Sequence, residues 1–483
     1  MPSVSKMNQL PDELLALIFA TSLRDLSSDA HQPLLALICS VCRHWRDVAI
    51  GASELWTTIH VPLEGHLPVI QTFLERSKGR LIDLDIMVLD SAILAHKVAE
   101  ITAPHISRAR TLIMSLPDLN IYNVFSKAYR TISATSLSSL SIHLTDALWS
   151  PQHGHSPLFA STNSLCYIDT EGYFLRDVPS MASLTALKLN KYCPTHVDLQ
   201  NLFDASPCLE TLVLHQFDMY EPLDLANEGD DGAPITIIAP ITLKFLAVSV
   251  FFAHSNDTDR CGCVLDKLCI PNLEYLEVVG STMDLNVHFR GLAKLQTLRI
   301  QRCTITSADQ FFLSAKELRR LELVDMPSED IRHITGISTE GPSSPFFPHL
   351  SSVFFSTKRE YMESPQQLLQ LAEHCVATRC SYFALEVEKG RIEEFLSAIK
   401  SRIQDGRVCI RESDCDCSGG LMVVTLFRTR ARRRSRRKRW TKRLSGSLSG
   451  RLSMMMNGMK RRTICVDSMR RIYKRVLLVP NLT

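Results

Sequence analysis

A short leucine motif recurs along the middle of this 483-residue chain and constrains its fold more than any other feature. The motif reads Leu-x-x-Leu-x-apolar. Six clear copies begin at Leu184, Leu209, Leu243, Leu273, Leu295 and Leu318. Each copy predicts one short strand followed by a return segment. Because no such unit closes a hydrophobic core alone, neighbouring units must bury one another's leucines. The motif therefore predicts a stack of similar units.

The spacing of the copies identifies the kind of stack. Successive copies are 25, 34, 30, 22 and 23 residues apart, and a period of about 20–29 residues with this consensus is typical of leucine-rich repeats. Loop insertions, such as the acidic segment 228–232, fit the longer steps. The alternative is one α/β domain whose strands happen to begin with leucine. We predict an α/β fold built as an irregular leucine-rich-repeat solenoid, or horseshoe. Weaker copies begin near Leu112, Leu137, Leu165 and Leu350.

The repeats are degenerate. The Asn or Cys that usually follows the strand is not regular, although Cys303 fits this position. Side chains between the leucines are expected to line the concave face, and they share no chemistry. This mixture suits recognition of a protein and offers no catalytic set. The residues are Lys188, Val213, Ala247, Glu277, Arg299 and Glu322.

The N-terminal stretch predicts two helices. Pro11 suits the first turn of a helix, and Asp12 and Glu13 place negative charge at its N-terminus. An apolar stripe at helical period follows from Leu14 to Phe19. We expect a second helix from about residue 33 to residue 50, ended by a glycine at 51. A bulky apolar plug, Leu55-Trp56, and a strand-like segment at 57–61 come next.

These residues resemble an F-box. The resemblance rests on LPDELLALIF, an apolar helix with VCRHWRDVA, then ELW and TTIHV, in that order. The style is that of the large F-box sets of mushroom-forming fungi, in which a polar insert, here about residues 23–32, separates two halves. The alternative is an ordinary helical cap on a larger domain.

The resemblance implies a docking module. F-boxes bind the Skp-type adaptor of cullin-RING ubiquitin ligases through these helices. Some of the matching residues must belong to the core of the module, and the sequence does not separate the two sets. The matching, adaptor-binding positions are Leu10, Pro11, Leu14, Leu15, Ile18, Phe19, Val41, Cys42 and Trp45.

Composition places the chain among ordinary globular proteins, with 45% hydrophobic and 22% charged residues. Fifteen scattered cysteines without a secretory signal predict reduced thiols and a location in the cytoplasm or the nucleus. The apolar segment 234–253 is long enough to span a membrane. However, Lys244 lies at its centre and Pro240 divides it, so we predict two buried strands and no membrane contact.

No constellation of catalytic residues is found in the sequence. It contains no Gly-rich phosphate loop after a strand, no G-x-S-x-G and no H-E-x-x-H. His254, Cys261, Cys263 and Cys269 contain enough ligand atoms for zinc, but they lack C-x₂-C spacing and predict a loop with free thiols. We expect no enzyme activity, no metal and no cofactor.

The C-terminal region changes in character twice. Residues 346–427 predict strands at 346–355, 382–388 and 421–427 and helices at 365–375 and 391–403, and they suggest a cap on the solenoid. From 428 to 483 the chain has nineteen basic residues and one acid, which leaves residues 1–427 with a net charge of −15. This tail resembles a nuclear-localisation or RNA-binding segment. The alternatives are a disordered extension without function, or a clamp onto the acidic body. The densest basic run is Arg432, Arg433, Arg434, Arg436, Arg437, Lys438 and Arg439.

The sequence thus predicts three parts: an F-box at 1–61, a repeat domain at 62–427 that recognises the substrate, and a disordered basic tail at 428–483. By resemblance, the chain is the substrate-recognition subunit of a cullin-RING ubiquitin ligase. It performs no chemistry and holds an unknown protein target near the ubiquitin-loaded enzyme. The alternatives are a nuclear scaffold that contacts nucleic acid through the tail, and an adaptor-binding protein that never joins a cullin.

Overall fold

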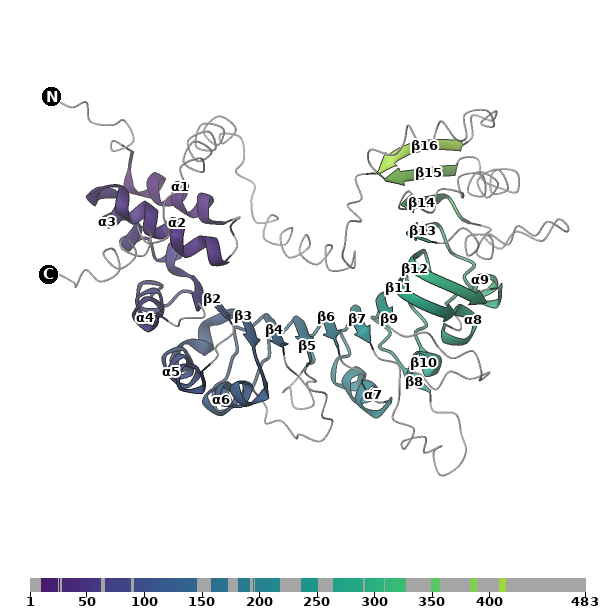
Figure 1. Ribbon diagram of the computed structural model, residues 1–483, viewed down its shortest axis with the longest axis horizontal. Coiled ribbons are helices and arrows are strands. Elements are labelled where there is room, and N and C mark those ends of the chain that lie inside the picture. The colour runs from purple at the N-terminus through teal and green to yellow at the C-terminus, as the bar shows by residue number, and fades with distance from the viewer. Residues whose placement is uncertain are drawn as a thin grey trace. The chain divides into compact units, whose positions relative to one another are not determined.

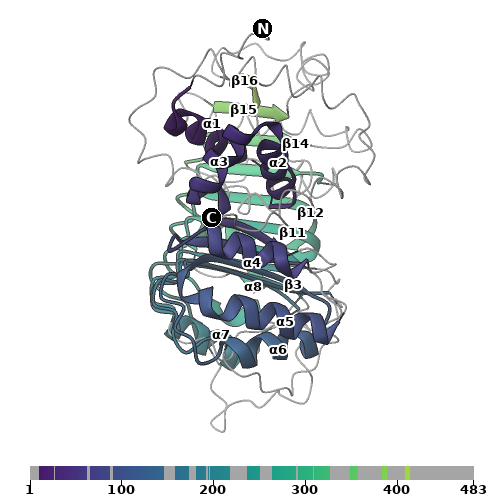
Figure 2. The same cartoon turned by 90° about the vertical axis from the view of Figure 1, so that its left-hand side faces the viewer.

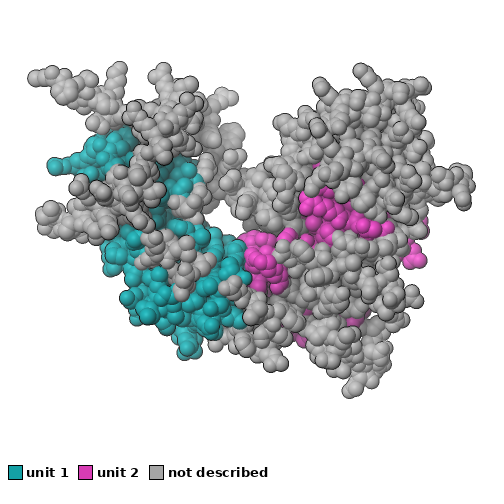
Figure 3. Space-filling model, viewed as in Figure 1, with its two compact units in different colours: residues 1–165, 177–179, 428–483 teal, residues 166–176, 180–427 magenta. Residues whose placement is uncertain are grey.

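The computed structural model describes residues 10–24, 26, 28–61, 66–87, 91–145, 158–172, 181–191, 194, 196–217, 236–250, 264–289, 292–307, 309–326, 349–356, 383–388 and 408–413. Contacts divide the chain into two compact units (Figure 3). The described residues of unit 1 lie between 10 and 165, and those of unit 2 between 166 and 413. The predicted boundaries at 61 and 427 stay predictions.

Unit 1 begins with three helices and continues as alternating helices and parallel strands. Strands β1 to β4 pair in chain order, and α4, α5 and α6 lie on one side of them (Figures 1 and 2). This is a helical N-terminal region followed by a mixed α/β region. The elements are α1 Asp12–Arg24, α2 Ser28–Val41, α3 Arg43–Gly51, the 3₁₀ helix η2 Ser53–Trp56, β1 Thr58–Val61, α4 Leu67–Arg76, β2 Ile82–Ile86, α5 Ala92–Thr102, the 3₁₀ helix η3 Ala103–Arg108, β3 Ala109–Leu116, α6 Leu119–Tyr129 and β4 Ser139–Leu144.

The N-terminal prediction was right about the first helix and wrong about the second. Residues 33–50 do not form one helix, because Cys42 is extended, with φ −158° and ψ 172°, and separates α2 from α3. The Cys42 thiol accepts a hydrogen bond from the Trp45 amide at 3.4 Å and caps the new helix. Helix α2 also begins five residues before Pro33, so most of the polar insert is helical. Gly51 ends α3 as predicted.

Unit 2 is a run of parallel strands with short helices on one side and no described helix on the other (Figure 1). All six clear copies of the leucine motif lie at strand starts, with the first leucine two residues before the strand. The elements are β5 Tyr167–Glu171, β6 Ala186–Asn190, α7 His196–Ala205, β7 Thr211–Phe217, β8 Ile237–Ile238, β9 Phe245–Val250, the 3₁₀ helix η5 Val264–Lys267, β10 Leu268–Cys269, β11 Tyr275–Asp284, α8 Leu285–His288, β12 Thr297–Ser307, α9 Asp309–Ser314, β13 Arg320–Val324, β14 Ser352–Ser356, β15 Phe383–Glu388 and β16 Val408–Ser413.

The second leucines of the motif form one buried row across unit 2. Strand pairing aligns Leu187, Leu212, Leu246, Leu276, Leu298 and Leu321, and all six are buried. The weaker copies at 137, 165 and 350 also precede strands by two residues. The copy placed near Leu112 was misaligned by three residues, because Leu112 pairs with Leu140, the second leucine of its neighbour.

One repeat position was not visible in the sequence. Strand register brings Gly172 beside Lys191, and Gly280 beside Arg302 and Asp325, at the position that follows the fifth strand residue. All five have φ between 50° and 68°. The left-handed conformation favours glycine but also accommodates other residues at a cost. Since Gly, Lys, Arg and Asp share no side-chain property, the sequence carries no signal for this shared turn.

The apolar segment 234–253 contains strands β8 and β9 on either side of Pro240, as predicted, but β8 is not fully buried, because Ile238 is 62% exposed. Strand β8 is only two residues long and pairs with β10 in a separate small sheet. Within the described residues, no helix is both long and apolar enough to cross a membrane. The predicted strands at the C-terminus are confirmed for β14 and β15, whereas β16 was missed. The predicted helices at 365–375 and 391–403, the strand at 421–427 and the basic tail lie outside the described residues.

Candidate functional site

The first three helices of unit 1 enclose a small core of their own. Leu15 and Phe19 of α1 are buried at 0% and 2% exposure, and the Phe19 ring lies 4.9 Å from the Trp45 ring. Trp56 is equally buried, and its indole N–H donates to the Ala49 carbonyl at 2.7 Å. Leu55 and Trp56 therefore form the predicted plug below the three helices.

The corner between α2 and α3 is fixed by two hydrogen bonds. One is the Cys42 cap on α3, and in the other the Arg46 Nε donates to the Cys39 carbonyl at 2.9 Å, near the C-terminus of α2. Burial raises the pKa of Cys39 to about 11, so this thiol stays protonated at neutral pH. The corner holds Val41 at the surface, where its side chain is 55% exposed.

Large apolar side chains remain exposed on this helical region. Leu14 and Leu17 of α1 are 47% and 57% exposed, and Leu37 and Val41 of α2 are 44% and 55% exposed. Residues three or four apart share one side of a helix, so each pair forms a short stripe. His44 Nε2 lies 3.6 Å from Asp12 Oδ1, which places the start of α3 next to the start of α1. A cluster of exposed apolar side chains is typical of a surface that binds another protein.

The structure separates the nine residues predicted to bind an adaptor. Leu15 and Phe19 are core residues. Pro11, Leu14 and Val41 are exposed, while Leu10, Ile18, Cys42 and Trp45 are half-buried. Sequence reasoning missed Leu17 and Leu37, whose positions in the apolar stripes did not distinguish surface from core. We call Leu14, Leu17, Leu37 and Val41 the apolar docking face.

Polar contacts join the helical region to the first strands of unit 1. Gln32 of α2 donates to the His60 carbonyl in β1 at 2.7 Å, and the Arg80 Nε donates to Ser53 Oγ at 2.6 Å. The Arg76 guanidinium lies 4.5 Å from the centre of the Trp56 ring, a cation–π contact. The helical region therefore packs as part of unit 1.

Comparison with known families identifies this region. Residues 7–62 match the model of the F-box-like family. These residues form an F-box-like domain. Within it the apolar docking face is contributed by α1 and α2, and the plug residues close its C-terminal end. A search of curated proteins found no match to the chain.

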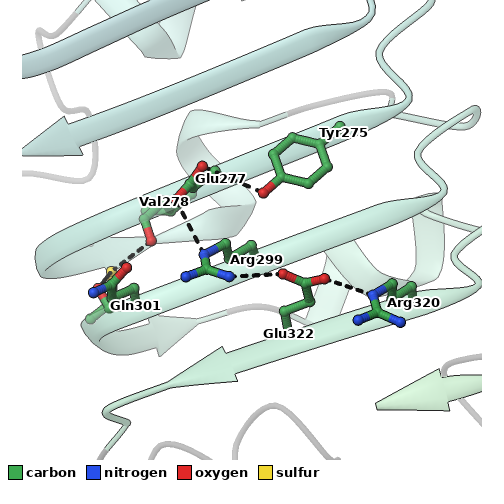
Figure 4. Close-up of polar contacts among 8 residues, drawn as sticks. Tyr275, Glu277, Val278, Arg299, Gln301, Arg320 and Glu322 are labelled. Atoms are coloured by element: carbon green, nitrogen blue, oxygen red, sulfur yellow. Dashed lines mark hydrogen bonds and ion pairs between the residues drawn. The ribbon is translucent and has the colours of Figure 1, made fainter. Parts of the chain in front are cut away.

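A second candidate site is the strand face of unit 2 opposite the leucine row, which we call the second strand face (Figure 4). Arg299 of β12 is 1% exposed and lies between two buried glutamates. Its Nε is 3.2 Å from Glu277 Oε1 in β11, and its Nη1 donates to Glu322 Oε2 in β13 at 3.0 Å. Arg320 Nε donates to the other oxygen of Glu322 at 2.6 Å, and the Tyr275 hydroxyl donates to Glu277 at 3.4 Å.

Burial by itself lowers the pKa of Arg299, but Glu277, Tyr275 and Glu322 together raise it above its ordinary value. The guanidinium is therefore permanently charged. Cys303, which was predicted to fill the Asn or Cys position, is buried, and its thiol donates to the Val278 carbonyl at 3.6 Å. These contacts bind β11, β12 and β13 to one another.

The sequence predicted that six side chains line a recognition surface on this face, and the structure buries five of them. Only Lys188 retains appreciable exposure, at 19%. Val213 and Ala247 belong to one apolar cluster, and Arg299 joins Glu277 and Glu322 through ion pairs. The zinc candidates Cys261 and Cys263 and the basic run at 432–439 lie outside the described residues.

Proposed function

We propose that the chain is the substrate-recognition subunit of a cullin-RING ubiquitin ligase. In this proposal, the F-box-like domain docks onto a Skp-type adaptor, and the adaptor joins it to a cullin. The observation that carries the proposal is the apolar docking face, because two exposed aliphatic stripes on a folded F-box-like domain are typical of a surface that binds another protein.

We further propose that the parallel strands belong to a leucine-rich-repeat domain that binds the protein target. The regular two-residue offset between motif and strand, the parallel pairing and the buried leucine row support it. The chain then acts by proximity and performs no chemistry itself, in the cytoplasm or the nucleus.

The test is co-purification with a Skp-type adaptor. The variant L14S/L17S/V41S changes only exposed side chains, so its helices are expected to fold. Trp45 is left intact because it packs against Phe19 in the core. The matched control is I93S, which removes a 71% exposed side chain from α5 of the same unit, outside the F-box-like domain. Wild type and I93S should capture the adaptor, and the triple variant should not.

Two results would overturn this proposal. Either wild type fails to capture the adaptor, or the triple variant captures it as well as I93S does. Tryptophan fluorescence, which reports the packing of Trp56, is used to check that each variant is folded. A cullin added to the captured complex then distinguishes a ligase subunit from a protein that binds the adaptor alone.

A second candidate function rests on the tail. Eleven of the sixteen residues from 428 to 443 are basic, a density sufficient for phosphate contacts. In this alternative the chain is a nuclear scaffold that binds nucleic acid. Affinity for RNA or DNA that falls steeply with salt and disappears on deletion of 428–483 would favour it over the ligase proposal.

A further inference from the structure

The second strand face presents an apolar centre. Val213, Ala247 and Tyr275 form a buried cluster, and Phe245 and Val279 pack against it while remaining partly accessible. The rings of Phe245 and Tyr275 lie 6.0 Å apart. All five belong to three neighbouring strands, β7, β9 and β11. The buried members hold the two accessible side chains in place.

Ion pairs flank this centre on both sides. Strand register places Lys188 next to Val213, and Lys188 Nζ lies 3.1 Å from Asp169 Oδ2. On the other side, Glu277 is next to Ala247 and belongs to the buried network with Arg299 (Figure 4). An apolar centre with polar groups at its edges is the usual anatomy of a protein-binding surface.

Charged side chains on these strands are paired. The first five residues of β5, β6, β7, β9, β11, β12 and β13 contain the acids Asp169, Glu171, Glu277 and Glu322 and the bases Lys188, Arg299 and Arg320. Each has an opposite charge within 4 Å. His215, at the edge of the apolar centre, has its pKa lowered by burial and then by Lys188, so it is neutral at pH 7.

This arrangement discriminates against a charged ligand. A phosphate that approached Lys188 or Arg320 would compete with Asp169 or Glu322 for a cation already paired. A charged segment that approached one member of an ion pair would meet the other member, which has the same sign as the segment, at a similar distance. An uncharged apolar segment neither competes for a paired charge nor meets a like charge, and it covers Phe245 and Val279.

We infer that the second strand face recognises its target through an uncharged, apolar peptide segment that seats on Phe245 and Val279, and not through a phosphorylated or strongly charged one. The inference rests on the proposed function in one respect, namely that unit 2 binds the target. It adds the chemical class of the segment that is recognised.

The experiment uses the full-length chain and an array of random 12-residue peptides, each synthesised with and without a central phosphoserine. Wild type is compared with F245S and with I241S. Ile241 is 75% exposed and lies four residues before Phe245, outside the second strand face, so I241S is the matched control. Peptides retained by I241S but lost by F245S define the strand-face set. Peptides bound by the basic tail are retained by both variants and drop out of this set.

The inference predicts a strand-face set that is rich in aromatic and aliphatic residues and near zero in net charge. Phosphorylation should leave its binding unchanged or weaken it, and raising the salt from 50 to 300 mM should alter binding by less than about twofold, because screening acts on charges. A strand-face set rich in phosphoserine or in net charge, or an empty set, would overturn the inference. Capture of the adaptor by the same three proteins is measured in parallel, so failure of the docking proposal is seen separately. Circular dichroism is used to check that F245S is folded.

Discussion

Replacing Arg299 by Met tests whether the buried ion pairs hold strands β11 to β13 together. The Met side chain fills much of the space but removes the cation that lies 3.2 Å from Glu277 and 3.0 Å from Glu322. Glu322 keeps Arg320 as a partner, and Glu277, buried beside the Tyr275 hydroxyl, loses its ion pair with Arg299. Removing one partner of a buried ion pair costs about 3–5 kcal/mol, because the remaining charge stays desolvated. We expect a loss of this size in the local stability of unit 2.

The assay must report on unit 2 specifically. The four tryptophans, at positions 45, 56, 149 and 440, lie outside residues 166–427, so fluorescence does not detect this unit. Hydrogen exchange followed by mass spectrometry resolves peptides from β11, β12 and β13. A loss of 3–5 kcal/mol corresponds to exchange about 10²- to 10³-fold faster, or more, for amides that exchange through opening of these strands.

Two further variants make the prediction refutable. Arg302 of the same strand is 54% exposed and pairs with Asp325 at 3.1 Å, so R302M should cost less than about 1 kcal/mol. Adding E277Q to R299M removes the buried charge that has lost Arg299 and should restore much of the lost protection. The reasoning fails if R299M exchanges no faster than R302M, or if E277Q brings no recovery.

Three further predictions concern caps, glycines and pH. In unit 1, D118A removes the hydrogen bond from the Ile121 amide to Asp118 Oδ1 at 2.9 Å and should lower the free energy of unfolding by about 0.5–2 kcal/mol. S91A should cost less, because its capping contact is 3.5 Å long. Thermal melts that rank the two variants in the reverse order would contradict this prediction. G280A should destabilise unit 2 by about 1–2 kcal/mol, because Gly280 has a left-handed φ of 65°. Gly79 has neither a left-handed backbone nor a neighbour within 4 Å of an added Cβ, so G79A should be neutral or stabilise the chain by about 0.4–1 kcal/mol. Equal effects of the two variants on hydrogen exchange would refute this prediction. Burial lowers the pKa of His31 from 6.5 to about 4, so the neutral imidazole favours the folded state fully above pH 6.5, and roughly 3 kcal/mol of folding stability is lost as the pH falls to 4. H31L should flatten this part of the pH–stability curve measured by tryptophan fluorescence. An unchanged curve would count against a neutral buried imidazole.

The strand positions could be predicted because they follow from burial alone. A leucine that must reach the core in every unit recurs at a fixed offset from its strand, so Leu184 and Leu318 each locate a strand despite irregular spacing. The first helix was equally clear from its proline, acids and apolar stripe. The break at Cys42 was not, because the apolar period continues across it while a single backbone residue becomes extended.

The docking face could be predicted only in part, for a physical reason. An apolar stripe that is wide enough to face both the core and a partner contains apolar residues throughout. The sequence pattern therefore does not tell which of them are buried and which are exposed. Leu14 and Leu15 are adjacent, yet one is 47% exposed and the other fully buried. Which side faces inward depends on where α3 packs, and this depends on contacts distant in sequence, such as Phe19 with Trp45. The partners of Arg299 are likewise 22 and 23 residues away along the chain, a distance at which sequence shows charges but not pairs.

The two candidate surfaces differ in what each needs from a partner. The apolar docking face is exposed and aliphatic, so under the ligase proposal an adaptor that covers it removes apolar area from water and stabilises the domain by an amount that grows with the logarithm of the adaptor concentration above its dissociation constant. On the second strand face the buried charges are already paired, so under the inference above a charged group of a partner would have to compete with an existing ion pair. Binding at the first surface should therefore raise the stability of unit 1 as adaptor is added. Binding at the second should depend on the shape and apolarity of the segment that covers Phe245 and Val279.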